Sequence, residues 1–318
     1  MATLLLSYPT ASFVPEGATA GETSAYTAHA ALGQWLALCD QLTRAGARIM
    51  VVDPPKVVAG PAPVADAGSA STVYAARLGA AFLSPGKLNR PSFLRARGAA
   101  PPLSPTEDTV SQAIAGAGLE VRLGQAQFQG QPDIIALDRN RFLLTYSSAP
   151  MASSKASLDE VKALLPMGAQ TLDIELAAPF TAGAQALCFL TGPSGSKVML
   201  IHRAALLSHT PEDIARFIGN KIETFIVAAD DIAVHACECI ALRGTIVLQE
   251  GSSTILRGQL ARRGFQIVQT DVSQLFGPGG GGPRMLVNEL SGMVLSDDAP
   301  SYSSRRDELQ QLLATYHR

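Results

Sequence analysis

The chain has 318 residues, of which 47% are hydrophobic and 16% are charged, and its formal net charge at pH 7 is −2. A net charge of −2 without clustered basic residues argues against nucleic-acid binding. No apolar run reaches the ~18 residues of a membrane span. Residues 1–10 lack the basic start and the long apolar run of a signal peptide. We therefore expect a cytoplasmic protein with one large core or two average ones.

The four cysteines do not form a metal-binding pattern. Cys39 and Cys188 lie in apolar stretches, where a free cysteine behaves as a small buried hydrophobe. Cys237 and Cys239 form a C-x-C pair, unlike the C-x-x-C of redox motifs and zinc sites. The sequence therefore predicts neither a metal nor a cofactor.

In chain order, the sequence repeats a unit of two short apolar segments, a helix and a third apolar segment. The first unit has a strand at 3–9, a helix over about residues 25–45 and a strand at 47–55. This helix is indicated by apolar residues at spacings of three and four, which are Ala28, Leu32, Trp35, Leu36, Cys39 and Leu42. The second unit pairs 71–85 as two strands, before a helix from about residue 105 and the strand LEVRL.

The third unit shows the pattern most clearly. A hairpin over 133–148 turns at DRNR, and a helix at 157–166 leads into a strand at 169–176. Ser157 with Glu160 three residues later is typical of a capping box, so we expect Ser157 to cap this helix.

The fourth and fifth units follow the same order. In the fourth, a hairpin over 184–206 precedes a helix whose start is marked by Thr210, Pro211 and Asp213. In the fifth, strands at VHACECIAL and GTIVLQE precede a helix over about 253–263 and the strand FQIVQTD. A last strand at 286–291 is expected to return to the first unit.

Five such units indicate a five-bladed α/β propeller, because closing the ring removes exposed sheet edges. The competing interpretation, a doubly wound sheet, fits less well, since the strands come in hairpin pairs. Residues 1–302 are expected to form the single propeller domain, and the helix at 303–318 to pack on it or in an oligomer contact. Residues 84–104 and 276–284 are expected to be loops near the mouth of the channel.

Several strings resemble the amidinotransferase and dimethylargininase group of the pentein superfamily, which modifies guanidino groups. They are LCFL at 187–190, LRGTIVL at 242–248, the run at 259–277 and GGGGPRMLVNEL at 279–290. The resemblance covers roughly the last two thirds of the chain and implies the pentein propeller. It also implies a cysteine nucleophile after the glycine-rich loop, a histidine, and acidic residues that hold the guanidinium group.

This sequence departs from the family at each of those positions. Met285 stands where the nucleophilic cysteine is expected, and a thioether cannot form a thiolate. Thr181 stands at the histidine, and threonine is no general acid or base near neutral pH. Gln129 replaces a glutamate while Asp133 remains, and Ser71 replaces an earlier aspartate. The resemblance therefore implies a pentein whose catalytic residues have been lost.

Two functions stay open, with a purely structural subunit, whose channel would be filled by side chains, as a third alternative. The first is a non-catalytic protein that binds a peptide or small-molecule intermediate, as an accessory factor of a specialised biosynthetic pathway, with a homodimer as a possible assembly. Its expected ligand-binding residues are Gln129, Asp133, Thr181, His235, Arg284 and Met285, of which Arg284 suits a carboxylate. The alternative is an amidinohydrolase or other C–N hydrolase in which His235 and Cys237 or Cys239, on one face of a strand, form a relocated site.

Overall fold

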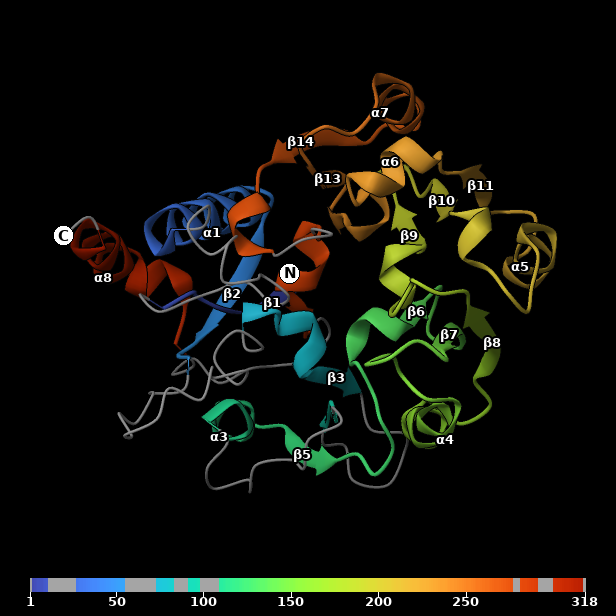
Figure 1. Cartoon of the computed structure of the whole chain (residues 1–318), viewed down its shortest axis with the longest axis horizontal. Helices are drawn as coiled ribbons and strands as arrows, with labels where there is room; N and C mark the ends of the chain where they lie inside the picture. The colour runs from blue at the N-terminus through green and yellow to red at the C-terminus, as the bar shows by residue number, and fades with distance from the viewer. Residues whose placement is uncertain are drawn as a thin grey trace.

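The computed structural model describes residues 2–10, 27–54, 73–82, 91–97, 109–276, 281–290 and 300–316. Five separate three-stranded sheets are arranged in a ring around a central axis, with the helices on the outside (Figure 1). In every sheet the middle strand is antiparallel to the inner strand and parallel to the outer one. The predicted five-bladed propeller is therefore confirmed.

The first sheet is completed by the end of the chain. Strand β1 (Ala2–Ser7) pairs in parallel with β2 (Ala47–Val52), and α1 (Ala28–Arg44) connects them. On its other side β1 pairs with β15 (Asn288–Glu289), with Leu4 opposite Glu289. The return of the last strand to the first unit, expected from the sequence, is confirmed.

The other four sheets use consecutive segments of the chain. The second sheet contains β3 (Gly79–Phe82), β4 (Ser92–Arg95) and β5 (Glu120–Leu123), with α3 (Thr109–Gly116). The third contains β6 (Ile134–Ala136), β7 (Arg141–Ser147) and β8 (Gln170–Leu176), with α4 (Lys155–Leu164). The fourth contains β9 (Leu187–Thr191), β10 (Lys197–Ile201) and β11 (Glu223–Ile226), with α5 (Pro211–Ile218). The fifth contains β12 (Ile240–Leu242), β13 (Thr245–Gln249) and β14 (Gln266–Thr270), with α7 (Thr254–Ala261).

A short 3₁₀ turn precedes the inner strand of each sheet. These turns are η2 (Ala75–Leu78), η3 (Gln131–Asp133), η4 (Gly183–Gln185), η6 (Ala236–Glu238) and η8 (Pro283–Leu286). Each of them contacts the next around the ring, and η8 contacts η2. The ring is thus closed by contacts between turns, while the sheets stay separate.

Local signals place most helix starts correctly. The Thr210 hydroxyl accepts from the backbone N–H of Asp213, whose carboxylate accepts in return from the N–H of Thr210. The predicted capping of α4 by Ser157 is wrong, because the helix begins at Lys155 after Ser154. Glu160 instead accepts from the backbone N–H groups of Gln125 and Ala126 and holds that loop.

The last helix, α8 (Tyr302–Thr315), lies against α1 on the outside of the first sheet (Figure 1). Tyr302 is buried with Trp35 in the largest apolar cluster, their rings meeting edge to face with centroids 6.0 Å apart. The Tyr302 hydroxyl donates to Asp40 at 2.8 Å, and Arg306 pairs with the same carboxylate at 2.9 Å. Among the described helices, none is both long and apolar enough to cross a membrane.

Candidate functional site

The centre of the ring contains a cavity of about 860 Å³. The inner strands and the turns beside them line most of it, because each strand turns one face to the axis and the other into its sheet's core. The turn at 138–140 and the end of α4 at 164–166 complete the wall. Most of the wall is apolar, and it includes Phe82, Ile135, Phe142, Leu187, Phe189 and Ile240. A mostly apolar cavity of this size with a few polar groups is typical of a small-molecule site.

Arg284 and Glu289 bring opposite charges to this wall. The Arg284 guanidinium lies 3.7 Å from the Glu289 carboxylate, and their side chains are 20% and 43% exposed. Gln131, also on the wall, uses its amide for two hydrogen bonds to the backbone of Glu289. Arg284 is therefore a cation that faces the cavity from η8, the turn before the closing strand.

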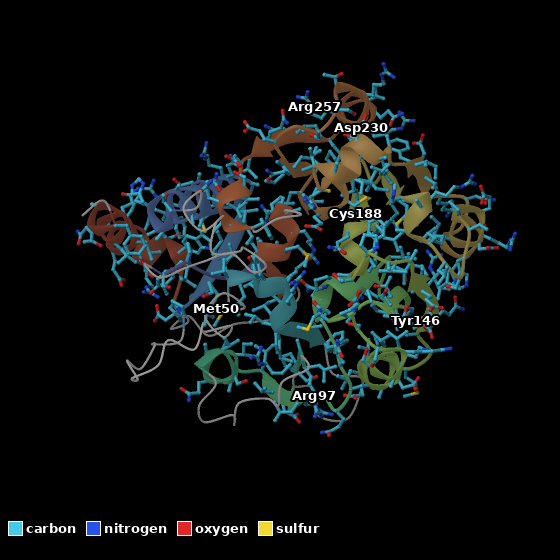
Figure 2. The ribbon with its side chains drawn as sticks, viewed as in Figure 1. Met50, Arg97, Tyr146, Cys188, Asp230 and Arg257 are labelled. Carbon is cyan, nitrogen blue, oxygen red and sulfur yellow. The ribbon has the colours of Figure 1, made fainter. Side chains whose placement is uncertain are left out.

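Three of the four cysteines line the same cavity: Cys188, Cys237 and Cys239. Cys188 lies at the inner edge of the ring, away from the outer helices (Figure 2). Its sulfur is 3.5 Å from that of Cys239, which comes directly before β12. The sequence drew attention to Cys237 and Cys239, but it gave no signal that Cys188, 51 positions away from Cys239, would join them.

These thiols differ in acidity. A hydrogen bond from the Cys239 thiol, helped by the charge of Arg284, holds the pKa of Cys188 below its ordinary value, although burial opposes this. The same contact and burial raise the pKa of Cys239 well above the ordinary value. Burial, followed by the nearby charge of Cys188, does the same to the pKa of Cys237. Cys188 is therefore the most acidic of the three thiols.

Met285, which the sequence resemblance assigned to the position of the family nucleophile, lies in η8. Its side chain is 2% exposed within the apolar cluster that also contains Trp35 and Leu286, and it is not part of the cavity wall. The structure thus places a core residue at this position, next to Arg284, which does reach the cavity.

Asp133 joins the third and fourth sheets. It is 1% exposed and accepts hydrogen bonds from Thr145 Oγ1 and Ser153 Oγ, each at 2.5 Å, and from the N–H of Gly183 at 2.8 Å. Burial raises its pKa to about 6, although these hydrogen bonds and the charge of Arg77 act in the opposite direction. Asp133 therefore acts as a buried joint between η3 and η4 and does not itself line the cavity, although its neighbours Pro132 and Ile134 do.

Gln129 and Thr181 lie close to this joint. The N–H of Gln129 donates to Ser153 Oγ at 2.8 Å, and the N–H of Thr181 donates to the Gln185 side chain at 2.9 Å. Neither residue lines the cavity. Ser71, the remaining family position singled out in the sequence, lies outside the described residues.

The expected strand through His235, Cys237 and Cys239 is wrong. Helix α6 (Ala229–Ala233) and η6 occupy this segment, and β12 begins only at Ile240. His235 has a left-handed backbone, with φ of 57°, and its Nδ1 lies 3.6 Å from Glu238 Oε1. The three residues therefore do not share a strand face, and His235 is not part of the cavity wall that holds both cysteines.

Glu238, which lies in this turn, is buried inside the ring. Its side chain is 1% exposed and accepts from the N–H of Gly282 at 2.5 Å, which joins η6 to η8. Within the described residues, no group of three or more His, Cys, Asp or Glu side chains is placed to hold a metal ion.

The arrangement matches solved structures over nearly the whole chain. The N-terminal domain of ArgZ, an arginine dihydrolase from cyanobacteria bound to its product, has a TM-score of 0.71 and 17% identity, covering 91% of this chain and 97% of that one. AgrE in a ternary complex with ornithine and NAD+ has a TM-score of 0.73 and 18% identity, covering 95% of this chain and 40% of that one. DDAH from Pseudomonas aeruginosa with citrulline has a TM-score of 0.60 and 14% identity, covering 91% and 98%.

The chain has the pentein fold. No family model and no curated protein matches its sequence. At these identities the likeness to solved structures establishes the pentein fold, and the chemistry has to be argued from the residues of the site.

Proposed function

We propose that this pentein-fold protein binds a small molecule with an apolar body and a carboxylate in its central cavity, without covalent catalysis. The observation that carries the proposal is that Met285 is buried in the core while Arg284, the residue before it, lines the cavity. At the position that the sequence resemblance assigns to the family nucleophile stands a core thioether, and the preceding residue brings a guanidinium to the cavity wall. A thioether has no ionisable proton and cannot attack a guanidinium carbon.

The charged residues of the wall are Asp138, Arg139, Arg284 and Glu289, and of these Arg284 is the partner that we assign to an anionic ligand. A guanidinium substrate that entered the cavity would meet the positive charge of Arg284, whereas a carboxylate would form a charge-assisted hydrogen bond with it. Among the described residues, Arg284 forms an ion pair with the Glu289 carboxylate, 3.7 Å away. The Glu289 side chain is 43% exposed and can exchange this contact for water.

The remaining wall suits an apolar ligand body. Aromatic and aliphatic side chains supply it, among them Phe82 and Phe189 of the inner strands and Phe142 of β7. Burying such a body gains about 25 cal/mol per Å² of apolar surface. The C-terminal carboxylate of a short apolar peptide has the same chemistry, so an accessory role in presenting a peptide intermediate is part of this proposal.

Catalysis by the cavity thiols has less support. Cys237 and Cys239 have raised pKa values, and no histidine belongs to the cavity wall in the described part of the chain. Cys188 has the lowered pKa, but a nucleophile also needs a group that moves protons within hydrogen-bond reach.

The binding test uses a medium-chain fatty acid and its methyl ester as probes, measured by isothermal titration calorimetry with the full chain. We expect the acid to bind and the ester to bind at least ~10-fold more weakly, because the ester cannot pair with Arg284. Arg284→Gln removes the same preference, while Arg216→Gln, a change on the exposed face of α5, leaves it intact. Equal affinities of acid and ester for the wild-type chain would refute the proposal.

The activity test uses arginine, agmatine and methylated arginines. We expect no turnover by the wild-type chain. We also expect none by Met285→Cys, because a thiol at that position would have no base to accept its proton and no carboxylates to hold a guanidinium group. Turnover that Cys237→Ala or Cys239→Ala abolishes would establish the hydrolase instead.

A further inference from the structure

We infer that Cys188 and Cys239 form a peroxide-oxidisable dithiol whose disulfide fastens the fourth sheet to the fifth across the cavity wall. The inference is independent of the ligand proposed above. It rests on the contact of two sulfur atoms, one on β9 and one directly before β12, in a cavity large enough to admit a small oxidant.

The geometry is close to that of a bond. The sulfurs are 3.5 Å apart, and a disulfide needs them at ~2.05 Å, so the closure is about 1.5 Å. Cys188 lies on β9 and Cys239 lies between η6 and β12, and β9 contacts η6 directly. Because the backbone segments are already neighbours, we expect rotation of the two side chains to bring the sulfurs together.

The two thiols have complementary roles. Cys188 is half-buried and has the lowered pKa, since the Cys239 thiol and Arg284 both stabilise its anion. A more acidic, accessible thiol is the one that reacts first with peroxide. Cys239 is 2% exposed with a raised pKa, which keeps it as a thiol at hydrogen-bond distance until the first step has occurred.

The reaction is balanced with a peroxide as oxidant. The Cys188 thiolate attacks one peroxide oxygen, the O–O bond breaks, and the leaving hydroxide takes a proton to give water and the sulfenic acid. The sulfur of Cys239 then attacks the Cys188 sulfur, and the departing hydroxyl takes the thiol proton as a second water. Two thiols and one hydrogen peroxide thus give one disulfide and two waters.

The disulfide would change the protein in two ways. It links positions 51 residues apart in the chain and so restricts the unfolded state, which is expected to raise the melting temperature by about 5 °C. It also replaces two thiols of the cavity wall by an apolar bridge. Cys237, which lines the same cavity, is the competing partner that the experiment has to separate.

The test treats the reduced full chain with one equivalent of hydrogen peroxide, alkylates it under denaturing conditions and maps the peptides by mass spectrometry. We expect the free thiols to fall from four to two in the wild type, with Cys188 linked to Cys239. Cys237→Ala and Cys39→Ala, the matched controls inside and outside the cavity, still form this link. In Cys239→Ala the link is lost and Cys188 is trapped as sulfenic acid by dimedone.

Three results would overturn the inference, and the wild-type map alone is able to show each of them. They are a link through Cys237, a link between two chains, and oxidation of Cys188 to the sulfinic acid while Cys239 stays a free thiol. Because the wild-type protein gives the deciding result, the inference remains testable even where a cysteine variant does not fold.

Discussion

Gln131 and Glu289, 158 positions apart, exchange two hydrogen bonds between the side-chain amide of the first and the backbone of the second. The amide Nε2 donates to the Glu289 carbonyl at 2.9 Å, and the Glu289 N–H donates to Oε1 at 2.8 Å. On its other edge β15 pairs with β1. Gln131 thus takes the place of a neighbouring strand and ties the third sheet to the strand that closes the ring.

Replacing Gln131 by alanine removes both of these hydrogen bonds. Because the backbone groups of Glu289 lose their partners, we expect the free energy of unfolding to fall by about 1–3 kcal/mol, measured by urea denaturation. Gln125→Ala, at an exposed position, is the control and is expected to change it by less than ~0.5 kcal/mol. Equal midpoints for the two variants would contradict the role assigned to Gln131.

Asp133 makes stability depend on pH. Its pKa is about 6 in the folded state, above the value of 3.8 for a free side chain, so the folded state holds the proton more tightly. The contribution of this group is therefore greatest below about pH 4 and is lost as pH rises towards 6. The shift corresponds to roughly 3 kcal/mol.

Asp133→Asn checks this dependence. We expect the difference in free energy of unfolding between wild type and variant to change between pH 4 and 6 and to be constant above about pH 7. Both proteins are measured in denaturant at each pH, because the comparison cancels the titration of all other groups. Parallel profiles for the two proteins would mean that Asp133 keeps an ordinary pKa.

The acidity of Cys188 depends on two neighbours, of which Cys239 has the larger effect and Arg284 the smaller. We expect Arg284→Leu to slow alkylation of Cys188 by iodoacetamide at pH 7 by about 2–5-fold, and Cys239→Ala to slow it more. The rate is followed against pH by peptide mass spectrometry, so that a shifted midpoint is distinguished from lost access. Arg216→Leu is the charge control, and an equal effect there would remove Arg284 from this role.

Tyr302 is expected to hold α8 on the propeller. Tyr302→Ala removes a ring that is 2% exposed and packs on Trp35, and should lower the free energy of unfolding by about 3–5 kcal/mol. Tyr302→Phe removes only the hydrogen bond to Asp40 and should cost about 1 kcal/mol. Denaturant titrations check both, with Met167→Ala, at a 91% exposed position, as the neutral control. Similar losses for Ala and Phe would place the effect in the hydroxyl and not in the ring.

The sequence by itself indicated five repeated units, because strand alternation and helix caps depend on residues only a few positions apart. The cap at Thr210 and the spacing of apolar residues in α1 are such signals. The identity of Met285 is equally local, and the proposal that this chain lacks the family's nucleophile rests on it. Even so, the expected strand pair of the second unit was wrong: η2 occupies 75–78, and β4 lies inside the segment 84–104 that was expected to be a loop. The cap expected at Ser157 was also displaced, since Ser154 begins the helix and Glu160 binds a distant loop.

Only the tertiary structure decided which residues line the central cavity. The alternating pattern around Cys237 predicted a strand, but the segment turns there because Glu238 binds Gly282, 44 positions further along the chain. Contacts between distant segments also place Cys188 beside Cys239. They bring Arg284 to the cavity wall while Met285 is buried in the core. Contacts between distant segments are set by how five sheets close around one axis, and hydrophobic periodicity, which is a local property, carries no information about that closure.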